Sequence, residues 1–344
     1  MPASLSVIVV TYNSRAAIER ALPALGAELL PGDEVIVADN HSADGSAERA
    51  RELLPEATVF DTGRNAGFSA AVNEAAARAR GELLLLLNPD AAVAPGFAHA
   101  IRRPLEDGRG WSAWQALVTL DDGRRVNTSG GVVHFTGVAW AGQTGLPVDA
   151  APREPCAVGF ASGACLAVPA RVWRELGGLP DWFFLYHEDV DLSLRIRLRG
   201  GHVGIEPAAR ADHDYEFAKG SLKWRMLERN RWATIVRTYP GPLLALLAPA
   251  LLAAEAAVVA AALTGGWGRQ KLLSWLDVAR ALPELLRERR AIQGARLVGS
   301  AEFASALTPE LSSAQLGRAA RSPAIQASLR AYWRLVRALL ASAS

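Results

Sequence analysis

Polar side chains follow three predicted strands in the first hundred residues of the chain. Ordinary explanations exist for each cluster, because Ser14 could cap a helix, while Asp39 and the Asn-Pro-Asp sequence suit turns. In an open α/β sheet, however, ligands bind beyond the carboxyl ends of the strands. Three clusters on one rim therefore predict a binding site there. The clusters are Thr11-Tyr12-Asn13-Ser14, Asp39-Asn40 and Asn88-Pro89-Asp90.

The predicted site lacks the glycine-rich loops that usually hold nucleotide phosphates. Thr11-Tyr12-Asn13 stands where a dinucleotide-binding protein carries closely spaced glycines, and the sequence has no Gly-Lys-Ser/Thr loop. The charge of a bound diphosphate would therefore have to be met by a metal ion. Asp90 lies at a strand end and could bind Mg²⁺ or Mn²⁺, which favour a carboxylate together with phosphate oxygens.

A second acidic cluster, Glu188, Asp189 and Asp191, begins a predicted helix directly after the aromatic-rich segment 183–187. Acidic residues favour helix N-termini, and Asp191 with Arg195 forms an i,i+4 pair, so a structural role explains these two residues. It does not explain why Glu188 and Asp189 follow aromatic side chains. A carboxylate beside a sugar-sized aromatic pocket could act as the general base for an acceptor hydroxyl.

His213 lies at a predicted strand-to-helix junction, just before a cluster of basic residues. A single histidine is more often structural than catalytic, but cations after it would suit a diphosphate. We therefore expect His213 to contact a metal ion or a phosphate. The basic residues are Lys219, Lys223, Arg225, Arg229 and Arg231.

The elements that must position these residues alternate between apolar β-rich runs and Ala-rich helical stretches. Buried strands separated by helices are typical of a doubly wound parallel sheet. The later segment 111–163 is rich in Gly, Val and Thr and contains Asp122-Gly123, so we expect antiparallel or irregular additions there. The expected strands are 5–10, 34–38, 58–61 and 83–87, and the expected helices are 15–25, 47–54 and 70–80.

The chain has 344 residues, of which 50% are hydrophobic, so it can bury a large core in two domains or in one domain with an appendage. A net charge of +2 does not indicate a nucleic-acid partner. Residues 269–344 nevertheless carry a net charge of +7, and residues 1–268 a net charge of −5. A basic C-terminal segment after an acidic N-terminal part favours binding to an anionic surface, and a bilayer is one candidate for that surface.

Cys156 and Cys165 show neither metal-binding spacing nor a disulfide framework, so we expect small core residues of a protein in a reducing compartment. The apolar run 5–10 is too short for a signal or a membrane span and is better explained as a first buried strand. These features predict a cytoplasmic location.

Residues 242–263 form an apolar stretch long enough to span a bilayer, which needs ~20 apolar residues. Glu255, Pro249 and the many alanines argue against a span, and two basic flanks fit a segment lying in the interface or a re-entrant pair. A pair of buried core helices is a nearly equal alternative. Trp267 and Trp275, with basic residues between them, favour peripheral attachment to the inner face of the cell membrane.

Taken in order, these motifs resemble those of family 2 inverting glycosyltransferases of GT-A fold. Residues 213–217 and 228–231 are similar to the bacterial rhamnosyltransferase-like branch of that family. The resemblance implies a GT-A type, Rossmann-like mixed α/β sheet flanked by helices in residues 1–237, and a helical, membrane-associating extension in 238–344. The motifs are residues 6–13, 39–46 and 65–68, Asn88-Pro89-Asp90, and Glu188-Asp189-Val190-Asp191-Leu192.

The resemblance also implies where the donor would bind. By position it assigns Thr11, Asn13 and Asp39 to the nucleobase side of a nucleotide-diphosphate sugar. It places three further residues along the ribose and diphosphate region, namely Asn65, Gly67 and Asn73.

For the chemistry, Asp90 matches the last acid of the family's metal-binding Asp-any-Asp motif, and His213 matches its second metal ligand. Asp189 matches the catalytic base, with Glu188 beside it. Asn88 occupies the first position of the metal motif in place of Asp, which removes one negative charge.

The implied reaction is a single in-line displacement that inverts the anomeric centre. Asp189 removes the acceptor proton, and Mg²⁺ or Mn²⁺ at Asp90 and His213 neutralises the departing nucleotide diphosphate. The resemblance makes dTDP-rhamnose the first expected donor, ahead of UDP-hexoses or galactofuranose. A cell-surface glycan or its lipid-linked precursor is the expected acceptor.

Two alternatives share the predicted sheet. A non-catalytic scaffold that binds lipid or polysaccharide is favoured by Asn88 in the metal motif. A sugar nucleotidyltransferase would use the same sheet and metal, but the sequence lacks a Gly-rich, basic loop after the first strand to hold a triphosphate.

Overall fold

The computed structural model describes residues 2–213, 220, 222–312 and 322–342. These residues form two compact units. The sheet unit comprises residues 2–131, 141–196 and 201–213. The helical unit comprises residues 132–140, 197–200 and the described residues from 220 onward.

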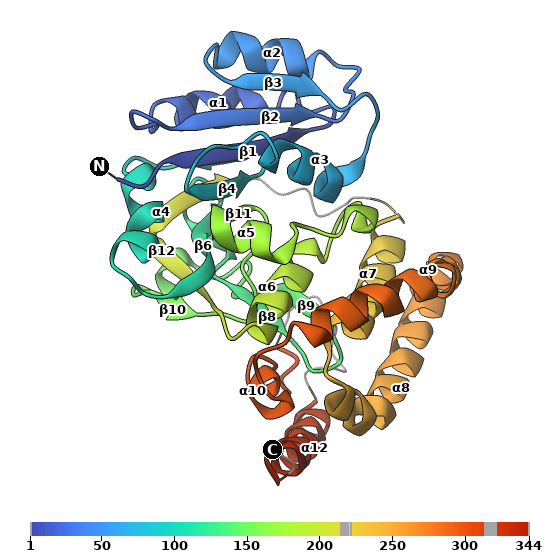
Figure 1. The fold of residues 1–344 in the computed structure, drawn as a ribbon. Coiled ribbons are helices and arrows are strands. Elements are labelled where there is room, and N and C mark those ends of the chain that lie inside the picture. Colours follow the sequence, from blue (N-terminus) through green and yellow to red (C-terminus); the bar gives the residue numbers. More distant parts are fainter. Residues whose placement is uncertain (1, 214–219, 221, 313–321, 343–344) are drawn as a thin grey trace. The chain divides into compact units, whose positions relative to one another are not determined.

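The sheet unit is built on a ten-stranded mixed sheet (Figure 1). Two short strands extend it, since β5 (Ala91–Val93) pairs with β12 and β7 (Arg125–Thr128) pairs with β6. Along the sheet the other strands are β10 (Cys156–Ala157), β12 (His202–His213), β6 (Trp111–Leu120), β11 (Cys165–Pro169), β4 (Leu83–Leu87), β1 (Leu5–Thr11), β2 (Glu34–Asp39) and β3 (Thr58–Asp61).

The strands β4, β1, β2 and β3 run parallel, and β11 lies antiparallel between β4 and β6. The predicted mixed α/β sheet is therefore confirmed, including antiparallel additions after residue 111. Cys165 is buried in β11, but Cys156 is exposed. The prediction that both cysteines are core residues is wrong for Cys156, because both residues of its short strand β10 are exposed.

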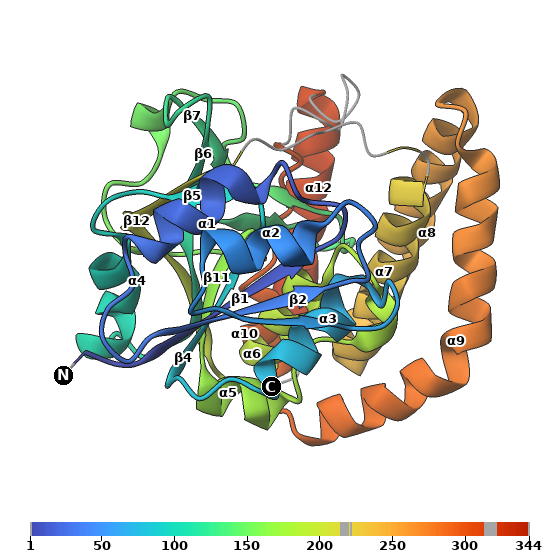
Figure 2. The same cartoon turned by 90° about the horizontal axis from the view of Figure 1, so that it is seen from above.

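Helices cover both faces of this sheet (Figures 1 and 2). Successive side chains of a strand point to opposite faces, so Val7 and Val9 pack into one apolar layer while Ile8 and Val10 pack into the other. The first layer includes residues of α1 (Ile18–Gly26), α2 (Ser46–Leu53) and α4 (Phe97–Glu106). The second includes residues of α3 (Gly67–Ala76), α5 (Ala170–Leu176) and α6 (Glu188–Leu198).

The helical unit contains the C-terminal helices and most of a small two-stranded sheet of β8 (Gly131–Val133) and β9 (Ala139–Ala141), whose outer residues Gly131 and Ala141 belong to the sheet unit. The predicted first domain ends at residue 237, whereas α7 belongs to the helical unit, because ion pairs such as Arg225–Asp277, at 2.7 Å, join it to α9. The helices are α7 (Leu222–Thr238), α8 (Gly241–Thr264), α9 (Gly268–Gly294), α10 (Ser300–Ala304) and α12 (Pro323–Ser342).

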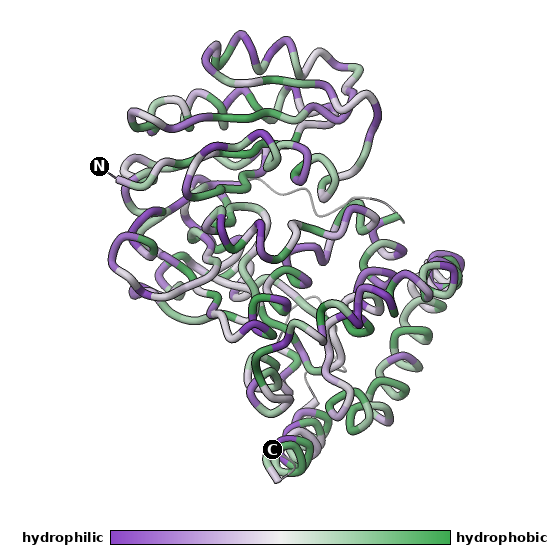
Figure 3. Tube along the Cα trace, viewed as in Figure 1, coloured by the Kyte–Doolittle hydropathy of each residue, from purple (hydrophilic) through white to green (hydrophobic). Residues whose placement is uncertain are grey.

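The apolar stretch of the tail forms α8, which is long and apolar enough to cross a membrane by length and composition. Its most apolar window has a mean hydropathy of 2.2 (Figure 3). Only 17% of that window is buried. Leu252 and Leu263 are 72% and 71% exposed. Glu255 is paired with Arg231 at 2.6 Å and with Lys271 at 2.5 Å, so the charge in the middle of α8 is held by the neighbouring helices α7 and α9.

Candidate active site

The carboxyl ends of β1 and β2 are joined through Thr11 and Asp39, which are partners in the parallel register. Thr11 Oγ1 donates a hydrogen bond to Asp39 Oδ1 at 2.6 Å. Ser42 donates twice to the same carboxylate, from Oγ at 2.6 Å and from its backbone N–H at 2.8 Å. Asp39 is only 2% exposed, so its charge fixes the loop after β2 through three short hydrogen bonds.

Asn13 belongs to the same network. Its backbone N–H donates to Ser42 Oγ at 2.9 Å, and its side-chain Oδ1 accepts from the N–H of Ala43 at 3.0 Å. The φ angle of 49° puts Asn13 in the left-handed region, which Asn tolerates better than most residues. The structure thus brings Thr11, Asn13 and Asp39 together on one rim, where Asn13 is exposed and Thr11 is fully buried.

Gly67 packs against the aromatic segment that precedes α6. It has a φ of 83°, and a Cβ there would lie 2.4 Å from the Phe184 ring, so only glycine fits. The next residue, Phe68, donates its N–H to the Phe184 carbonyl at 2.6 Å. Asn65 accepts from the Gly67 N–H at 3.1 Å. This contact sets the start of α3 at Gly67, before the predicted start at residue 70.

Asn73 lies further along α3 and has a different environment. Its side-chain amide donates to the Leu179 carbonyl at 2.7 Å and to Asp181 at 2.5 Å, and its Oδ1 accepts from the Leu179 N–H at 2.9 Å. The amide therefore fixes the segment between α5 and α6. A contact with the diphosphate, as the resemblance implies, would require some of these hydrogen bonds to be broken.

Asp90 and His213 are 123 positions apart in the sequence but adjacent in the sheet unit. Pairing of β5 with β12 places His213 opposite Ala91, the residue after Asp90. His213 Nε2 lies 2.8 Å from Asp90 Oδ1, and Asn88 Nδ2 lies 3.3 Å from the same nitrogen. The three residues thus converge at the carboxyl end of β4.

The donor atoms of this pair suit a hard divalent cation. Two ligands at right angles around Mg²⁺ or Mn²⁺ are ~3 Å apart when each lies at about 2.1 Å from the metal, which resembles the observed 2.8 Å between Asp90 and His213. No cluster of three or more His, Cys, Asp or Glu side chains that could hold a metal occurs in the described ranges. Phosphate oxygens and water would therefore have to complete the coordination shell.

Asn127, in β7, holds the His213 ring from its other side. The amide Nδ2 lies 3.2 Å from His213 Nδ1 and donates to the His213 carbonyl at 3.2 Å. A metal on Nε2 needs the ring proton on Nδ1, which Asn127 can accept only through its amide oxygen; with Nδ2 facing the ring, the amide fixes the position of His213. Asn127 was not predicted, because nothing near it in the sequence marks it as a partner of His213.

Asp189 is joined to the metal-binding motif through the turn before β11. Gly163 donates its N–H to Asp189 Oδ2 at 3.0 Å, and the Ala164 carbonyl accepts from the Asn88 N–H at 3.0 Å. The other carboxylate oxygen accepts from the Val190 N–H at 2.8 Å. The structure therefore places the predicted base and the predicted metal motif on either side of one short turn, which the sequence analysis did not single out.

Glu188 is buried beside Asp189 without a complete set of partners. It is 7% exposed, and among the described residues its Oε2 atom has no hydrogen-bond partner. Burial raises the pKa of Glu188 to about 8, and the charge of Asp189 adds to the increase. Burial also raises the pKa of Asp189, although the N–H groups of Gly163 and Val190 oppose this. A proton held on Glu188 would leave Asp189 as the ionised carboxylate of the pair.

The segment before α6 is strained. Phe184, Tyr186 and His187 have φ angles of 62°, 71° and 69°, in a region that costs a non-glycine residue about 1–3 kcal/mol. Strain of this kind often lies at functional sites, where the surrounding structure imposes it. Aromatic residues carry no sequence signal for positive φ, so the sequence analysis could not predict it.

Other singled-out residues have structural partners. The predicted pair of Asp191 and Arg195 is confirmed, with 2.6 Å between carboxylate and guanidinium, both buried. In the basic cluster after His213, Arg225 pairs with Asp277, and Arg231 pairs with Glu228 and Glu255, all within the helical unit. The residues 214–219 of that stretch, including Lys219, lie outside the described residues.

The family model and the named relatives described here are all those of glycosyltransferases. Residues 6–130 match the model of Glycosyl transferase family 2, a range that includes Asp90 but ends before Asp189 and His213. A protein of Mycobacterium tuberculosis named N-acetylglucosaminyl-diphospho-decaprenol L-rhamnosyltransferase is 29% identical over 242 residues, which are 63% of this chain and 78% of the relative. The low-salt glycan biosynthesis hexosyltransferase Agl10 of Haloferax volcanii is 25% identical over 61% of this chain and 67% of its own length.

Among solved structures, the crystal structure of GalNAc-T7 with UDP, GalNAc and Mn²⁺ superposes with a TM-score of 0.58 at 16% identity. The match covers 71% of this chain and half (50%) of that chain. At this identity the likeness concerns the fold alone, and it confirms the predicted GT-A type sheet.

Proposed function

We propose that this chain, a family 2 glycosyltransferase, transfers a sugar from a nucleotide-diphosphate donor to a hydroxyl group of a glycan or of its lipid-linked precursor. The observation that carries the proposal is the turn that joins Asp189, through Gly163 and Ala164, to Asn88 in the metal motif. Around it, the proposed base and the two proposed metal ligands lie in one compact unit, as a displacement at an anomeric carbon requires.

In this proposal Asp90 and His213 hold Mg²⁺ or Mn²⁺, which supplies positive charge to the diphosphate of the donor when bound. Asn88 contributes no negative charge, so the protein ligands are a single carboxylate and an imidazole. Such a sparse set suits a metal that binds together with its diphosphate, since Mg²⁺ is commonly held by one or two carboxylates plus phosphate oxygens. Asn127 keeps the His213 ring in orientation.

Asp189 is the proposed base and receives the proton of the acceptor hydroxyl as its oxygen attacks the anomeric carbon. Configuration inverts, because the attack comes from the face opposite the leaving diphosphate. One catalytic carboxylate suffices, since the leaving group is already activated. Glu188 supports this role by holding a proton beside Asp189, so that a single negative charge resides on the pair.

The donor is proposed to lie along the rim of β1, β2 and the start of α3. Thr11, Asn13 and Asp39 form the nucleobase end, and their hydrogen bonds hold that end in shape before the donor arrives. Asn65 and Gly67 then lie toward the ribose and diphosphate, where the missing side chain of Gly67 allows close approach. Asn73 is the least supported of the proposed contacts, because its amide is already bonded.

For the donor sugar, dTDP-rhamnose is our first proposal. Its support is the relative in Mycobacterium tuberculosis, which is named as an L-rhamnosyltransferase acting on a diphospho-decaprenol compound. The same name supports a lipid-linked acceptor. The relative in Haloferax volcanii is named as a hexosyltransferase, so UDP-hexoses follow as the second choice.

We further propose that residues 1–237 carry catalysis and that residues 238–344 attach the enzyme to the cytoplasmic face of the cell membrane. The exposed apolar side chains of α8 and the basic balance of residues 269–344 support a peripheral attachment.

Thermal shift with a panel of dTDP-, UDP- and GDP-sugars tests the donor site. We expect one nucleotide to raise the melting temperature in Mn²⁺ or Mg²⁺ and to lose this effect in EDTA, because a ligand that binds only the native state stabilises it. Asp90→Ala should abolish the metal-dependent shift. Asp149→Ala, which removes an exposed carboxylate of the same unit, should keep it.

Absence of a shift with every donor would contradict the proposal and favour the non-catalytic scaffold. Transfer that is lost in Asp189→Asn would exclude that scaffold. Release of diphosphate from a nucleoside triphosphate and a sugar phosphate would instead indicate the nucleotidyltransferase.

A further inference from the structure

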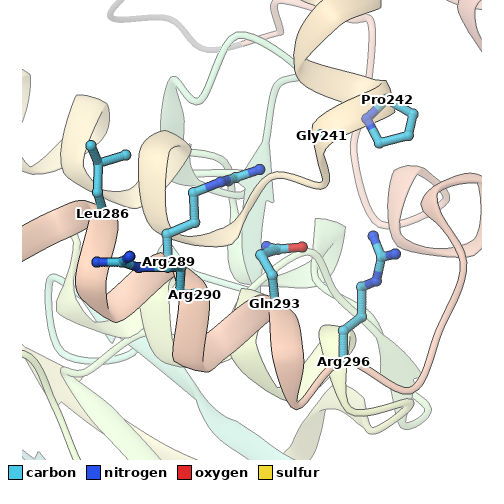
Figure 4. Close-up of a pocket in the computed structure, with 7 residues that line it drawn as sticks. All are labelled: Gly241, Pro242, Leu286, Arg289, Arg290, Gln293 and Arg296. Atoms are coloured by element: carbon cyan, nitrogen blue, oxygen red, sulfur yellow. The ribbon is translucent and has the colours of Figure 1, made fainter.

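The helical unit contains a cleft of about 530 Å³ between the start of α8 and the second half of α9. Its size falls within the range of ~300–1,000 Å³ that is typical of small-molecule sites. Gly241 and Pro242 border it from α8 (Figure 4). From α9 and the residues just after it, the lining consists of Leu286, Arg289, Arg290, Gln293 and Arg296.

Three of these side chains are arginines, and none of the three forms an ion pair within the described ranges. The nearest acids on α9 are engaged elsewhere, since Glu284 pairs with Arg287 and Glu288 pairs with Arg237. Burial and the neighbouring charge of Arg296 both lower the pKa of Arg289. The cleft therefore concentrates positive charge that no described carboxylate balances.

Two polar side chains of the cleft are held in place by the end of α7. Arg289 Nη1 donates to the carbonyls of Val236 and Tyr239 at 2.7 Å each, and Gln293 Nε2 donates to the Thr238 carbonyl at 2.9 Å. These partners are neutral, so they orient the Arg289 guanidinium without cancelling its charge. A preorganised cation of this kind loses little conformational entropy when an anion binds.

Two of the arginines point to the same side of the cleft. Arg289 lies on α9 and Arg296 just after its end, and both side chains point toward Gly241 and Pro242 (Figure 4). Gly241 begins α8, so the positive end of the α8 dipole adds to the charge of the cleft. Arginines also complement the C-terminal end of a helix such as α9, but that preference does not explain why they border a cavity.

The helix that begins at the cleft is the apolar α8. Only 17% of its most apolar window is buried, so most of that window is exposed. An anion held at Gly241 could therefore carry a hydrocarbon chain along an apolar helix. Phosphate groups are the anions that suit several arginines best, because guanidinium and phosphate form paired, charge-assisted hydrogen bonds.

We propose that the cleft formed by Arg289, Arg290 and Arg296 at the start of α8 binds the phosphate or diphosphate group of a lipid. The site is separate in its residues from the donor and metal sites, and it goes beyond the proposed transfer reaction. It would bind a lipid phosphate whether or not that lipid is the acceptor.

The test compares the full chain with Arg290→Ala/Arg296→Ala, which leaves Arg289 to hold the end of α7. The matched control is Arg269→Ala/Arg280→Ala, which removes two exposed arginines from the same helix. Melting temperatures without ligand establish that both variants fold. Binding is measured by flotation with phosphatidylcholine vesicles that contain phosphatidic acid, or phosphatidylserine at equal surface potential, and by thermal shift with inorganic diphosphate. EDTA is present throughout, so that a metal-dependent donor site does not contribute.

We expect the wild type and the control to bind phosphatidic acid vesicles more tightly than phosphatidylserine vesicles. The Arg290→Ala/Arg296→Ala variant should bind phosphatidic acid roughly tenfold more weakly than the control, because it loses charge-assisted hydrogen bonds to phosphate. Equal losses in the two variants, or equal binding to the two lipids, would overturn the proposal, since both indicate general attraction to negative charge.

Inorganic diphosphate distinguishes the source of the phosphate. A thermal shift that depends on Arg290 and Arg296, without binding to phosphatidic acid vesicles, would retain the phosphate site but overturn its assignment to a lipid. Binding to neither probe would overturn the site altogether.

Discussion

Glu188 of the sheet unit and Glu228 of the helical unit are both buried, and the two glutamates behave in opposite ways. Glu188 and Glu228 are 7% and 8% exposed. Glu228 accepts hydrogen bonds from Arg231 at 2.8 and 3.0 Å and pairs with Lys271 at 2.5 Å. Although burial opposes the change, these cations lower the pKa of Glu228. Burial raises the pKa of Glu188, whose Oε2 finds no partner among the described residues.

The difference shows that burial alone does not assign a role to a carboxylate. A buried acid enclosed by cations holds helices together, and removal of one partner leaves uncompensated charge. A buried acid that lacks cations destabilises the fold when it ionises, so its presence is best explained by chemistry. We therefore expect variants of Glu188 and Asp189 to change activity and variants of Glu228 to change stability.

The largest effect is expected for Asp189→Asn. Loss of a positioned general base should lower kcat by about 10²–10⁴-fold, while the melting temperature changes little, because Asn can still accept from Gly163 or Val190. Single-turnover transfer assays and thermal denaturation measure the two effects. The control is Asp107→Asn, which changes an exposed carboxylate paired with Arg109 in the same unit. Unchanged kcat would remove Asp189 from the proposed role.

Glu228→Gln should produce the complementary result. It leaves Glu255 as the acid that faces Arg231 and Lys271, and we expect the free energy of unfolding to fall by ~3 kcal/mol. Chemical denaturation followed by tryptophan fluorescence measures the loss. Glu284→Gln, at a more exposed ion pair of the same unit, should cost less than about 1 kcal/mol. If Glu228→Gln reduced kcat of the folded enzyme instead, the proposed contrast between a catalytic Glu188–Asp189 pair and a structural Glu228 would be wrong.

A pH dependence of stability also distinguishes the two glutamates. The pKa of Glu188 is raised in the folded state, so its proton stabilises the fold at low pH and stability falls as pH rises between the unfolded value and about 8. The steepest slope from this group is about 1.4 kcal/mol per pH unit. Glu188→Gln should remove that slope, which denaturation at pH 5 to 9 would measure.

Glu228 has the opposite sign. The pKa of Glu228 is lowered in the folded state, so its ion pairs stabilise the protein above the unfolded pKa, and this stabilisation is lost as pH falls through the folded pKa. Glu228→Gln should therefore change the acid limb of the stability profile and leave the slope near neutral pH intact. Identical profiles for the wild type and Glu188→Gln would show that Glu188 titrates normally.

Much of the parallel sheet was predictable because it rests on local apolar pattern. The expected strands 58–61 and 83–87 agree with β3 and β4 at both ends, and β1 and β2 each extend one residue further. Helix starts were less predictable. The start of α3 at Gly67 depends on the Phe184 segment, which is more than a hundred positions away in the sequence.

The candidate site was only partly predictable for the same reason. Asp90 and His213 could each be singled out from residue type and position, but their contact depends on the pairing of β5 with β12. Gly163 and Asn127 gave no usable signal, because their roles are hydrogen bonds to partners distant in sequence.

The sequence by itself determined the alternation of strands and helices, the polar strand ends and the acidic start of α6, because periodicity and residue type act over a few neighbouring positions. Only the tertiary structure decided which acids are enclosed by cations, which residue supports Asp189, and which arginines border the cleft at the start of α8. Those properties arise where side chains from separate elements lie within a few ångströms of one another. Hydrogen bonds, ion pairs and desolvation all depend on such short distances.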